Sequence, residues 1–186
     1  MATAGPSFCG TGANSNDGGT TAWTSPTNIQ GDTTTTSATC NIGSNPGTSQ
    51  LLRASNFGFS IPSTATILGV TVEVERSAAN ANRHFDDTIK LLKAGTEAGT
   101  NQSAGAAIPT TKAFATYGSS SSLWGTTLTP TDVNDSGFGL SFKINRNSSQ
   151  TTTTSVFRVR ITVEYSTSTY VNFESVGRGM FRGMRA

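Results

Sequence analysis

The sequence is short of charge, of aromatic side chains and of the residues that most often bind metals or act as nucleophiles. Charged residues make up 13% of its 186 residues, about half the usual share, and aromatic residues make up 8%. There is one histidine, His84, and there are two cysteines, Cys9 and Cys40. No C-x-x-C or H-x-x-x-H spacing occurs, which excludes the common zinc motifs. Two cysteines are also too few for a disulfide framework.

Long apolar runs are missing as well. No run approaches the length of a membrane span, and the first residues lack the basic and apolar regions of a secretory signal. We therefore expect the chain to fold in a cytoplasm and to have no membrane partner. Disulfides are rare in that compartment. We favour free thiols at Cys9 and Cys40 that pack as small apolar groups, and a bridge between them is the alternative.

The few chemically active residues form no recognisable catalytic pattern. His84 is close in sequence to Asp86 and Asp87, but no serine stands in the G-x-S-x-G context of a nucleophile. Residues 14–19, NSNDGG, have the composition of a calcium loop without its later glutamate. The glycines of 177–183 lack the strand-to-helix context of a phosphate loop. We therefore predict no enzymatic activity, no metal site and no cofactor.

Hydroxyl side chains, in contrast, are abundant, with 32 threonines and 23 serines. Threonine favours strands, and serine favours turns. Alternation of apolar and polar residues predicts firm strands at 67–77, 85–95, 138–145 and 155–166. Weaker patterns predict further strands at 21–30, 33–42, 49–62 and 111–118. The composition and the period-two patterns together indicate an all-β protein.

The phase of each firm strand predicts which side chains face the core. The inward set comprises Leu68, Val70, Val72, Val74, Phe85, Asp87, Ile89, Leu91, Phe138, Leu140, Phe142, Ile144, Phe157, Val159, Ile161, Val163 and Tyr165. Helix is nearly absent, although Thr129 is placed to cap one helical turn that has Pro130 at its first position and ends by Gly137. Sheets that are apolar on one face must bury those faces against each other.

These patterns predict an antiparallel β-sandwich, jelly-roll-like, with about eight strands and extended N- and C-terminal arms. We place the sandwich at residues 21–166. Residues 1–20 are rich in glycine, asparagine and serine and lack periodicity, which predicts a flexible N-terminal arm. Residues 167–186 are predicted to be an extended C-terminal docking arm.

The C-terminal arm differs from the rest of the chain in charge. Three of the 13 basic residues, Arg178, Arg182 and Arg185, follow the last acidic residue, Glu174, and the rest of the chain has ten basic against eleven acidic residues. A near-neutral body and only three arginines argue against direct nucleic-acid binding. Methionine and phenylalanine interleave with these arginines, as expected of a segment that orders on a protein partner. The candidate partner-binding residues are Tyr170, Phe173, Val176, Arg178, Met180, Phe181, Arg182, Met184 and Arg185.

Three aromatic residues raise a different hypothesis. Trp23, Tyr117 and Trp124 lie in or near predicted loops, where they are candidates for a sugar-stacking platform in a carbohydrate-binding sandwich. The interpretation that we favour is that the two tryptophans anchor the core or its rim.

Several motifs resemble those of a known group of proteins. They are W-x-x-P-x-N-I at 23–29, L-x-x-S-N-F-G-F-x-I-P at 52–62 and A-T-I-L-G-V-x-V-E-V-E-R at 65–76. The later Y-G, L-W-G, T-P-x-D-V-N, F-G-L and I-T-V-E-Y continue the pattern to about residue 165. In this order they resemble a set of small virion proteins of tailed bacteriophages. The resemblance implies a β-sandwich structural subunit without enzymatic activity.

We therefore expect a structural protein of a bacteriophage virion, assembled in the host cytoplasm. A capsid decoration (cement) protein is the preferred role, because a small, nearly neutral sandwich with adhesive arms suits the locking of neighbouring coat subunits. A neck, tail or baseplate subunit is one alternative, and the carbohydrate-binding module is another. The expected partners are the major capsid protein or other virion subunits. We also expect a homo-oligomer, with a trimer as the working hypothesis, because closed symmetric assemblies predominate and coat lattices offer three-fold sites.

Overall fold

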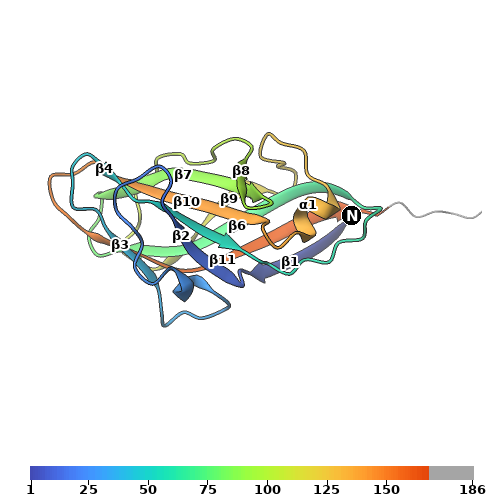
Figure 1. Ribbon diagram of the computed structural model, residues 1–186, viewed down its shortest axis with the longest axis horizontal. Helices are drawn as coiled ribbons and strands as arrows, with labels where there is room; N and C mark the ends of the chain where they lie inside the picture. The colour runs from blue at the N-terminus through green and yellow to red at the C-terminus, as the bar shows by residue number, and fades with distance from the viewer. Residues whose placement is uncertain (168–186) are drawn as a thin grey trace, which may run out of the picture.

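The computed structural model describes residues 1–167 and consists mainly of strands. In this part of the chain, eleven strands form two antiparallel sheets that pack against each other (Figure 1). The first sheet has the order β1-β11-β6-β9, with β3 also paired to β11, and the second has the order β2-β5-β10-β7-β8, with β4 also paired to β10. The predicted all-β sandwich is confirmed, with eleven strands in place of about eight. The jelly-roll topology stays a prediction.

The strand bounds follow the predicted periodicity most closely in the long central strands. The first sheet contains β1 (Ala2–Phe8), β3 (Ala38–Asn41), β6 (Thr66–Ala78), β9 (Ala113–Ser119) and β11 (Thr153–Ser166). The second sheet contains β2 (Thr11–Ser15), β4 (Gly47–Thr48), β5 (Leu51–Ser55), β7 (His84–Lys93), β8 (Thr96–Ala98) and β10 (Gly139–Arg146). The inner faces of β6 and β10 bury the predicted valine, leucine, phenylalanine and isoleucine side chains in one core, which is the main source of stability expected for a sandwich.

The single helical turn forms where the sequence predicts it. α1 (Pro130–Asn134) begins with Pro130, and a capping box stabilises its N-terminus. In this box the Thr129 and Asp132 side chains each accept a hydrogen bond from the other residue's backbone N–H. It ends at Asn134, whose side chain bonds both the N–H and the carbonyl of Ile61 at 2.8 Å. The predicted strand at 49–62 is shorter than expected, because only Leu51–Ser55 join the sheet. The apolar residues that follow, Phe57, Phe59 and Ile61, are buried in the core although they belong to no strand.

The sandwich has two distinct ends. At one end Ala2 pairs with Tyr165 and Thr66 pairs with Ser166, and we call this end the tail pole because residues 168–186 follow there. At the other end Arg146 of β10 pairs with His84 of β7, and the loops 79–83 and 147–152 join the strands. This loop pole lies at the left of Figure 1, opposite the N-terminus.

The structure corrects the prediction of a flexible arm at residues 1–20. Ala2–Phe8 pairs with β11, and Thr11–Ser15 pairs with β5. These strands could not be predicted from the sequence, because their small and polar side chains show no apolar alternation. Their backbone groups nevertheless pair with β11 and β5. A neighbouring segment approaches β2 so closely at Gly12 that no side chain fits there: a Cβ at this position would lie 2.2 Å from the Pro26 carbonyl oxygen.

The predicted strand at 21–30 is also wrong. Pro26–Ile29 form a short 3-10 helix, and Trp23 lies outside any strand. Trp23 is nevertheless a core residue, with 4% of its surface exposed, so the predicted anchoring role is confirmed without the predicted strand. Proline at the first helical position explains why this segment forms a helical turn and not a strand. Its fixed φ suits a helical turn, and it has no N–H to donate to a strand ladder.

Three β-bulges change the predicted inward sets. The ladder of β10 with β7 shifts between Lys143 and Ile144, so Asp86 faces the core and Asp87 faces outward. The ladder of β11 with β6 shifts between Val156 and Arg158. The core position falls on Val156 there, while Phe157 lies on the outer face under the Lys112 ammonium. Phe85, Asp87 and Phe157 were therefore assigned to the wrong face, because a bulge reverses the alternation within one strand. A further shift of the ladder of β11 with β6, between Glu164 and Tyr165, buries Ile67 and leaves Leu68 only half-buried, so Leu68 was assigned wrongly as well.

Candidate functional site

The three candidate sugar-stacking residues are buried. Trp23, Tyr117 and Trp124 expose 4%, 8% and 1% of their surface. Each ring also uses its polar atom inside the protein: Trp23 Nε1 donates to the Gln50 carbonyl at 2.9 Å, and Trp124 Nε1 donates to the Val70 carbonyl at 2.9 Å. These residues present no open aromatic face, so the sequence hypothesis of a stacking platform at these positions is wrong. The favoured interpretation, core anchoring, is confirmed.

Tyr117 instead belongs to a polar cluster between the sheets. Its hydroxyl donates to Asp86 Oδ2 at 2.8 Å, and Asp86 Oδ1 accepts a bond from Arg76. The Arg76 guanidinium lies against the Tyr117 and Phe142 rings, at 5.7 and 5.8 Å from their centroids. Burial, together with the negative charge of Asp86, raises the pKa of the Tyr117 phenol far above its usual range. The cluster joins β6, β7 and β9 and is closed to solvent, so its role is structural.

His84 does not take part in a catalytic arrangement. It is the first residue of β7 and is fully buried. Its Nδ1 lies 2.8 Å from Thr154 Oγ1. Burial, with a smaller contribution from the nearby Arg146 charge, lowers the pKa of His84 to about 4. Asp86 bonds Arg76 and Tyr117, and Asp87 pairs with Lys143, so neither carboxylate orients the imidazole.

The two cysteines are free and buried. Cys9 Sγ donates to the Ile29 carbonyl at 3.1 Å. Burial raises the pKa of each thiol to about 12. The interpretation of Cys9 and Cys40 as buried free thiols is therefore confirmed, and the bridge is not formed. Neither thiol has the lowered pKa and exposure of a reactive cysteine.

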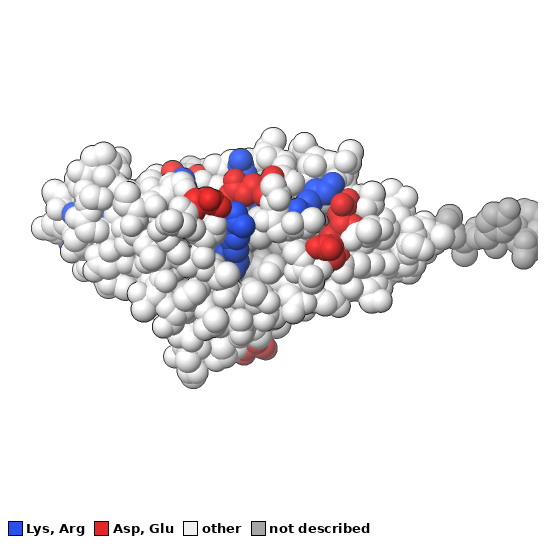
Figure 2. All heavy atoms as spheres, viewed as in Figure 1, with Lys and Arg blue, Asp and Glu red and all other residues white. Residues whose placement is uncertain are grey.

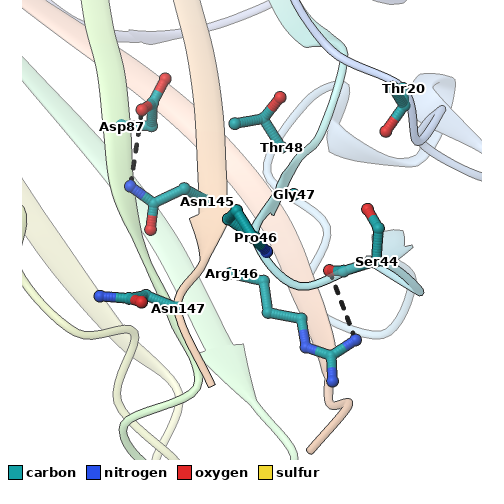
Figure 3. A pocket seen from close by; sticks show the side chains of 9 residues that line it. All are labelled: Thr20, Ser44, Pro46, Gly47, Thr48, Asp87, Asn145, Arg146 and Asn147. Atoms are coloured by element: carbon teal, nitrogen blue, oxygen red, sulfur yellow. Dashed lines mark hydrogen bonds between the residues drawn. The ribbon is translucent and has the colours of Figure 1, made fainter. Parts of the chain in front are cut away.

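A groove of about 500 Å³ opens on the second sheet near the loop pole (Figure 3). Four segments contribute to it: the loop after β2, the segment that leads into β4, the bulge of β7 and the end of β10. Its lining residues are Thr20, Ser44, Pro46, Gly47, Thr48, Asp87, Asn145, Arg146 and Asn147. Because these residues come from distant parts of the chain, only the assembled sheet creates the groove.

The charged groups of the groove already have partners within the protein. Lys143 Nζ lies 2.8 Å from Asp87 Oδ2, and this interaction lowers the pKa of Asp87 in spite of its partial burial. Arg146 is 4% exposed and donates to the carbonyls of Ile42, Gly43, Ser44, Ser148 and Ser149. Arg146 therefore ties together the loops of this pole, and each of its three guanidinium nitrogens already donates to a backbone carbonyl.

The amide of Asn145 is different, because its hydrogen-bonding capacity is largely unused. Its Nδ2 reaches Asp87 Oδ1 only at 3.5 Å, the long limit of a hydrogen bond. Its Oδ1 is buried and has no donor. Figure 3 shows this side chain between Asp87 and Asn147. The Thr48 hydroxyl is also weakly used, with a single contact of 3.4 Å to the Gly18 carbonyl.

Elsewhere on the surface, opposite charges lie next to each other. On the second sheet, Arg53 pairs with Asp17 at 2.9 Å and Lys90 pairs with Glu97 at 3.6 Å. Figure 2 shows such mixed basic and acidic groups with wide uncharged areas around them. On the first sheet, Arg160 forms two bonds with Glu73, at 2.8 and 2.9 Å. These pairs leave no patch of one sign on the face seen in Figure 2.

The described residues show neither a metal-ligand cluster nor a membrane-spanning helix. Within residues 1–167, no three histidine, cysteine, aspartate or glutamate side chains gather as a metal site would require. No helix of this part is both long and apolar enough to cross a bilayer. Comparison with family models, curated proteins and solved structures gave no match. The function must therefore be inferred from the geometry and the sequence of this chain.

The groove was not predicted from the sequence, although the sequence contains one indication of the bulge that forms its wall. Asp86 and Asp87 are consecutive in a segment whose phase is set by Ile89 and Leu91. Strict alternation would put one charge into the core, so two adjacent aspartates are typical of a break in the ladder. The predicted partner-binding residues from Tyr170 to Arg185 lie outside the described residues, and their role stays a prediction.

Proposed function

We propose that this chain is a non-enzymatic structural protein of a bacteriophage particle. In this proposal it is a capsid decoration protein that docks on coat subunits through its C-terminal segment. The motif resemblance over residues 23–165 is one support. A second support is that the buried carboxylate of Asp86 is used within the protein, where it bonds Tyr117 and Arg76 and holds the two sheets together.

The observation that carries the proposal is the pairing of Ala2 with Tyr165. It puts the end of β11 at the tail pole, so the segment 168–186 begins there. That segment combines three arginines with Met180, Phe181 and Met184. Arginine suits carboxylates, and methionine adapts to shallow apolar pockets. Docking through this segment would orient the sandwich with its tail pole towards the particle and its loop pole away from it.

Repetition would make weak docking effective. Burial of three apolar side chains contributes about 1.5–3 kcal/mol each, from which the cost of ordering the segment is subtracted. A single segment therefore binds weakly on its own. Several segments in a homo-oligomer, for which a trimer is the working hypothesis, would bind with a much higher avidity.

The copy number of the chain in purified particles tests the proposal directly. Quantitative mass spectrometry against the major coat protein should find hundreds of copies for a decoration protein. About six or twelve copies would indicate the neck, tail or baseplate alternative. Absence of the chain from the particles contradicts both structural roles.

A variant pair tests the docking segment. Removal of residues 176–186 should abolish rebinding to particles that lack the chain, while the melting temperature of the sandwich stays unchanged. Phe181→Ser should weaken rebinding strongly. Arg178→Lys, which keeps the charge, is the matched control and should bind nearly as well as the native chain. Unchanged rebinding after truncation contradicts the docking role of the segment.

A further inference from the structure

The groove at the loop pole contains a side chain that the bulge of β7 directs outward. The ladder shift opposite Lys143 and Ile144 puts Asp86 in the core and leaves Asp87 on the outer face. Bulges that re-aim a side chain are frequent next to functional sites. Here the result is a carboxylate at the groove wall beside the Asn145 amide, at 3.5 Å (Figure 3).

The charge state of the groove argues against an ionic ligand. A cation would compete with the Lys143 ammonium, which already lies 2.8 Å from the Asp87 carboxylate. An anion would need free donors from Arg146, but five backbone carbonyls accept the bonds of its guanidinium. The groove therefore fits a neutral ligand better than an ion of either sign.

The hydrogen-bonding groups of the groove indicate what kind of neutral ligand fits. Asn145 Oδ1 is buried without a donor, an arrangement that is unfavourable until the amide turns towards a partner. The weak contacts of Asn145 Nδ2 and of the Thr48 hydroxyl leave both a donor and a donor-acceptor group available. A ligand hydroxyl can donate to one such group and accept from another. The Pro46 ring adds an apolar surface to the same wall.

We propose that this groove binds a neutral saccharide. Sugar hydroxyls would bond Asp87, Asn145 and Thr48, and the C–H face of a ring would lie on Pro46. This site shares no residue with the stacking platform that the sequence indicated. A docked particle protein of the kind proposed above would expose the groove, because the groove lies near the pole opposite the end of β11. The inference does not depend on that function, since the isolated chain can be tested.

The test is a titration of the isotopically labelled full chain with a panel of uncharged mono- and oligosaccharides, followed by amide chemical shifts. The panel includes glucose, galactose, mannose and N-acetylglucosamine and their short oligomers. At least one sugar should shift the amides of Gly47, Thr48, Asn145 and Asn147 with a dissociation constant in the millimolar range or tighter. Asn145→Ala should weaken binding by roughly tenfold, the usual effect of one lost hydrogen bond. Thr48→Val should weaken it as well, without a change of shape.

Three controls keep the outcome clear. Asn41→Ala removes an exposed strand asparagine outside the groove and should leave the affinity unchanged. Inorganic phosphate and calcium should cause no saturable shift in the groove, and saturation by either one instead of a sugar overturns the proposal. Groove shifts caused by removal of residues 168–186 alone would identify the chain's own segment as the occupant and overturn it too. Absence of groove shifts with every sugar also overturns it.

Discussion

Tyr117 and Asp86 meet between the two sheets, where the Tyr117 hydroxyl on β9 donates to Asp86 Oδ2 on β7 at 2.8 Å. This bond and the Arg76–Asp86 pair connect three strands, β6, β7 and β9, that belong to different sheets. A buried carboxylate is tolerated only where its oxygens are satisfied, so each partner holds the others in place. The cluster therefore specifies how the two sheets sit on each other at this point.

Substitution of one residue of this cluster should destabilise the fold, because its partners then lose their hydrogen bonds. Tyr117→Phe leaves Asp86 Oδ2 without its donor, and we expect a loss of about 1–3 kcal/mol in the free energy of unfolding, measured by urea denaturation. Asp86→Leu leaves the Arg76 charge buried and unpaired and should cost about 3–5 kcal/mol.

The matched variants for this cluster are a single and a double substitution. Tyr165→Phe, at the partly buried rim of the core, should change stability much less than Tyr117→Phe. Arg76→Met combined with Asp86→Leu should be far less destabilising than Asp86→Leu alone, because the uncompensated charge is gone. Equal losses for Asp86→Leu and the double variant would show that the ion pair is not the cause.

Stability should fall with acidification through His84. The folded protein holds this pKa at about 4, below the ordinary 6.5, so the unfolded chain binds the proton more readily. The contribution is complete above pH 6.5 and is lost as the pH falls towards 4, with a slope of up to about 1.4 kcal/mol per pH unit. Denaturation at several pH values between 6.5 and 5 measures this slope.

The control for that prediction is His84→Gln, which cannot titrate. The lowered pKa values of Asp87 and Asp132 cause their own losses only near and below 3.8, so they lie outside the diagnostic window. The variant should show a flatter profile between pH 6.5 and 5 than the native chain. An identical slope in both proteins would assign the effect to another group.

The thiols of Cys9 and Cys40 should be inert in the folded protein. Exposure of 1% and 2% and pKa values of about 12 suppress the thiolate at neutral pH. Reaction with a disulfide reagent should therefore be slow in buffer and should reach two thiols per chain in concentrated guanidinium chloride. Rapid labelling in buffer, or an intact mass two hydrogens lower than that of the reduced chain, would contradict the buried free thiols.

Gly118 should be far less replaceable than another glycine with the same backbone conformation. Gly118 and Gly58 have φ values of +71° and +68°, so alanine at either position costs about 1–2 kcal/mol. A Cβ at Gly118 would also lie 2.4 Å from the Val70 carbonyl oxygen and 2.5 Å from Trp124 Nε1, whereas Gly58 faces open space.

We expect Gly118→Ala to be the more destabilising of the two variants by about 1–3 kcal/mol, measured by thermal unfolding. Trp124 fluorescence should change in Gly118→Ala, because the indole must move from its bond to Val70. Equal melting temperatures for the two alanine variants would mean that the contact relaxes without cost.

The sequence was enough to predict those structural features whose determining residues lie close together in the chain. The alternation predicted both β6 and β10, with the buried face of β10 and that of β6 from Val70 to Val74, because the period of side chains is set by the backbone itself. The capping box of α1 was readable for the same reason, since Thr129 and Asp132 are three residues apart. The all-β class follows from the same local preferences.

What the sequence by itself determined is therefore the class of fold, the central strands, the helical turn and the near-neutral charge of the body. Only the tertiary structure decided which residues form β1 and β2, which of Asp86 and Asp87 enters the core, and how Pro46, Thr48 and Asn145 come to line one groove. The physical reason is that these outcomes depend on hydrogen-bond ladders and buried partners between distant segments. A one-residue shift in such a ladder reverses every side chain beyond it.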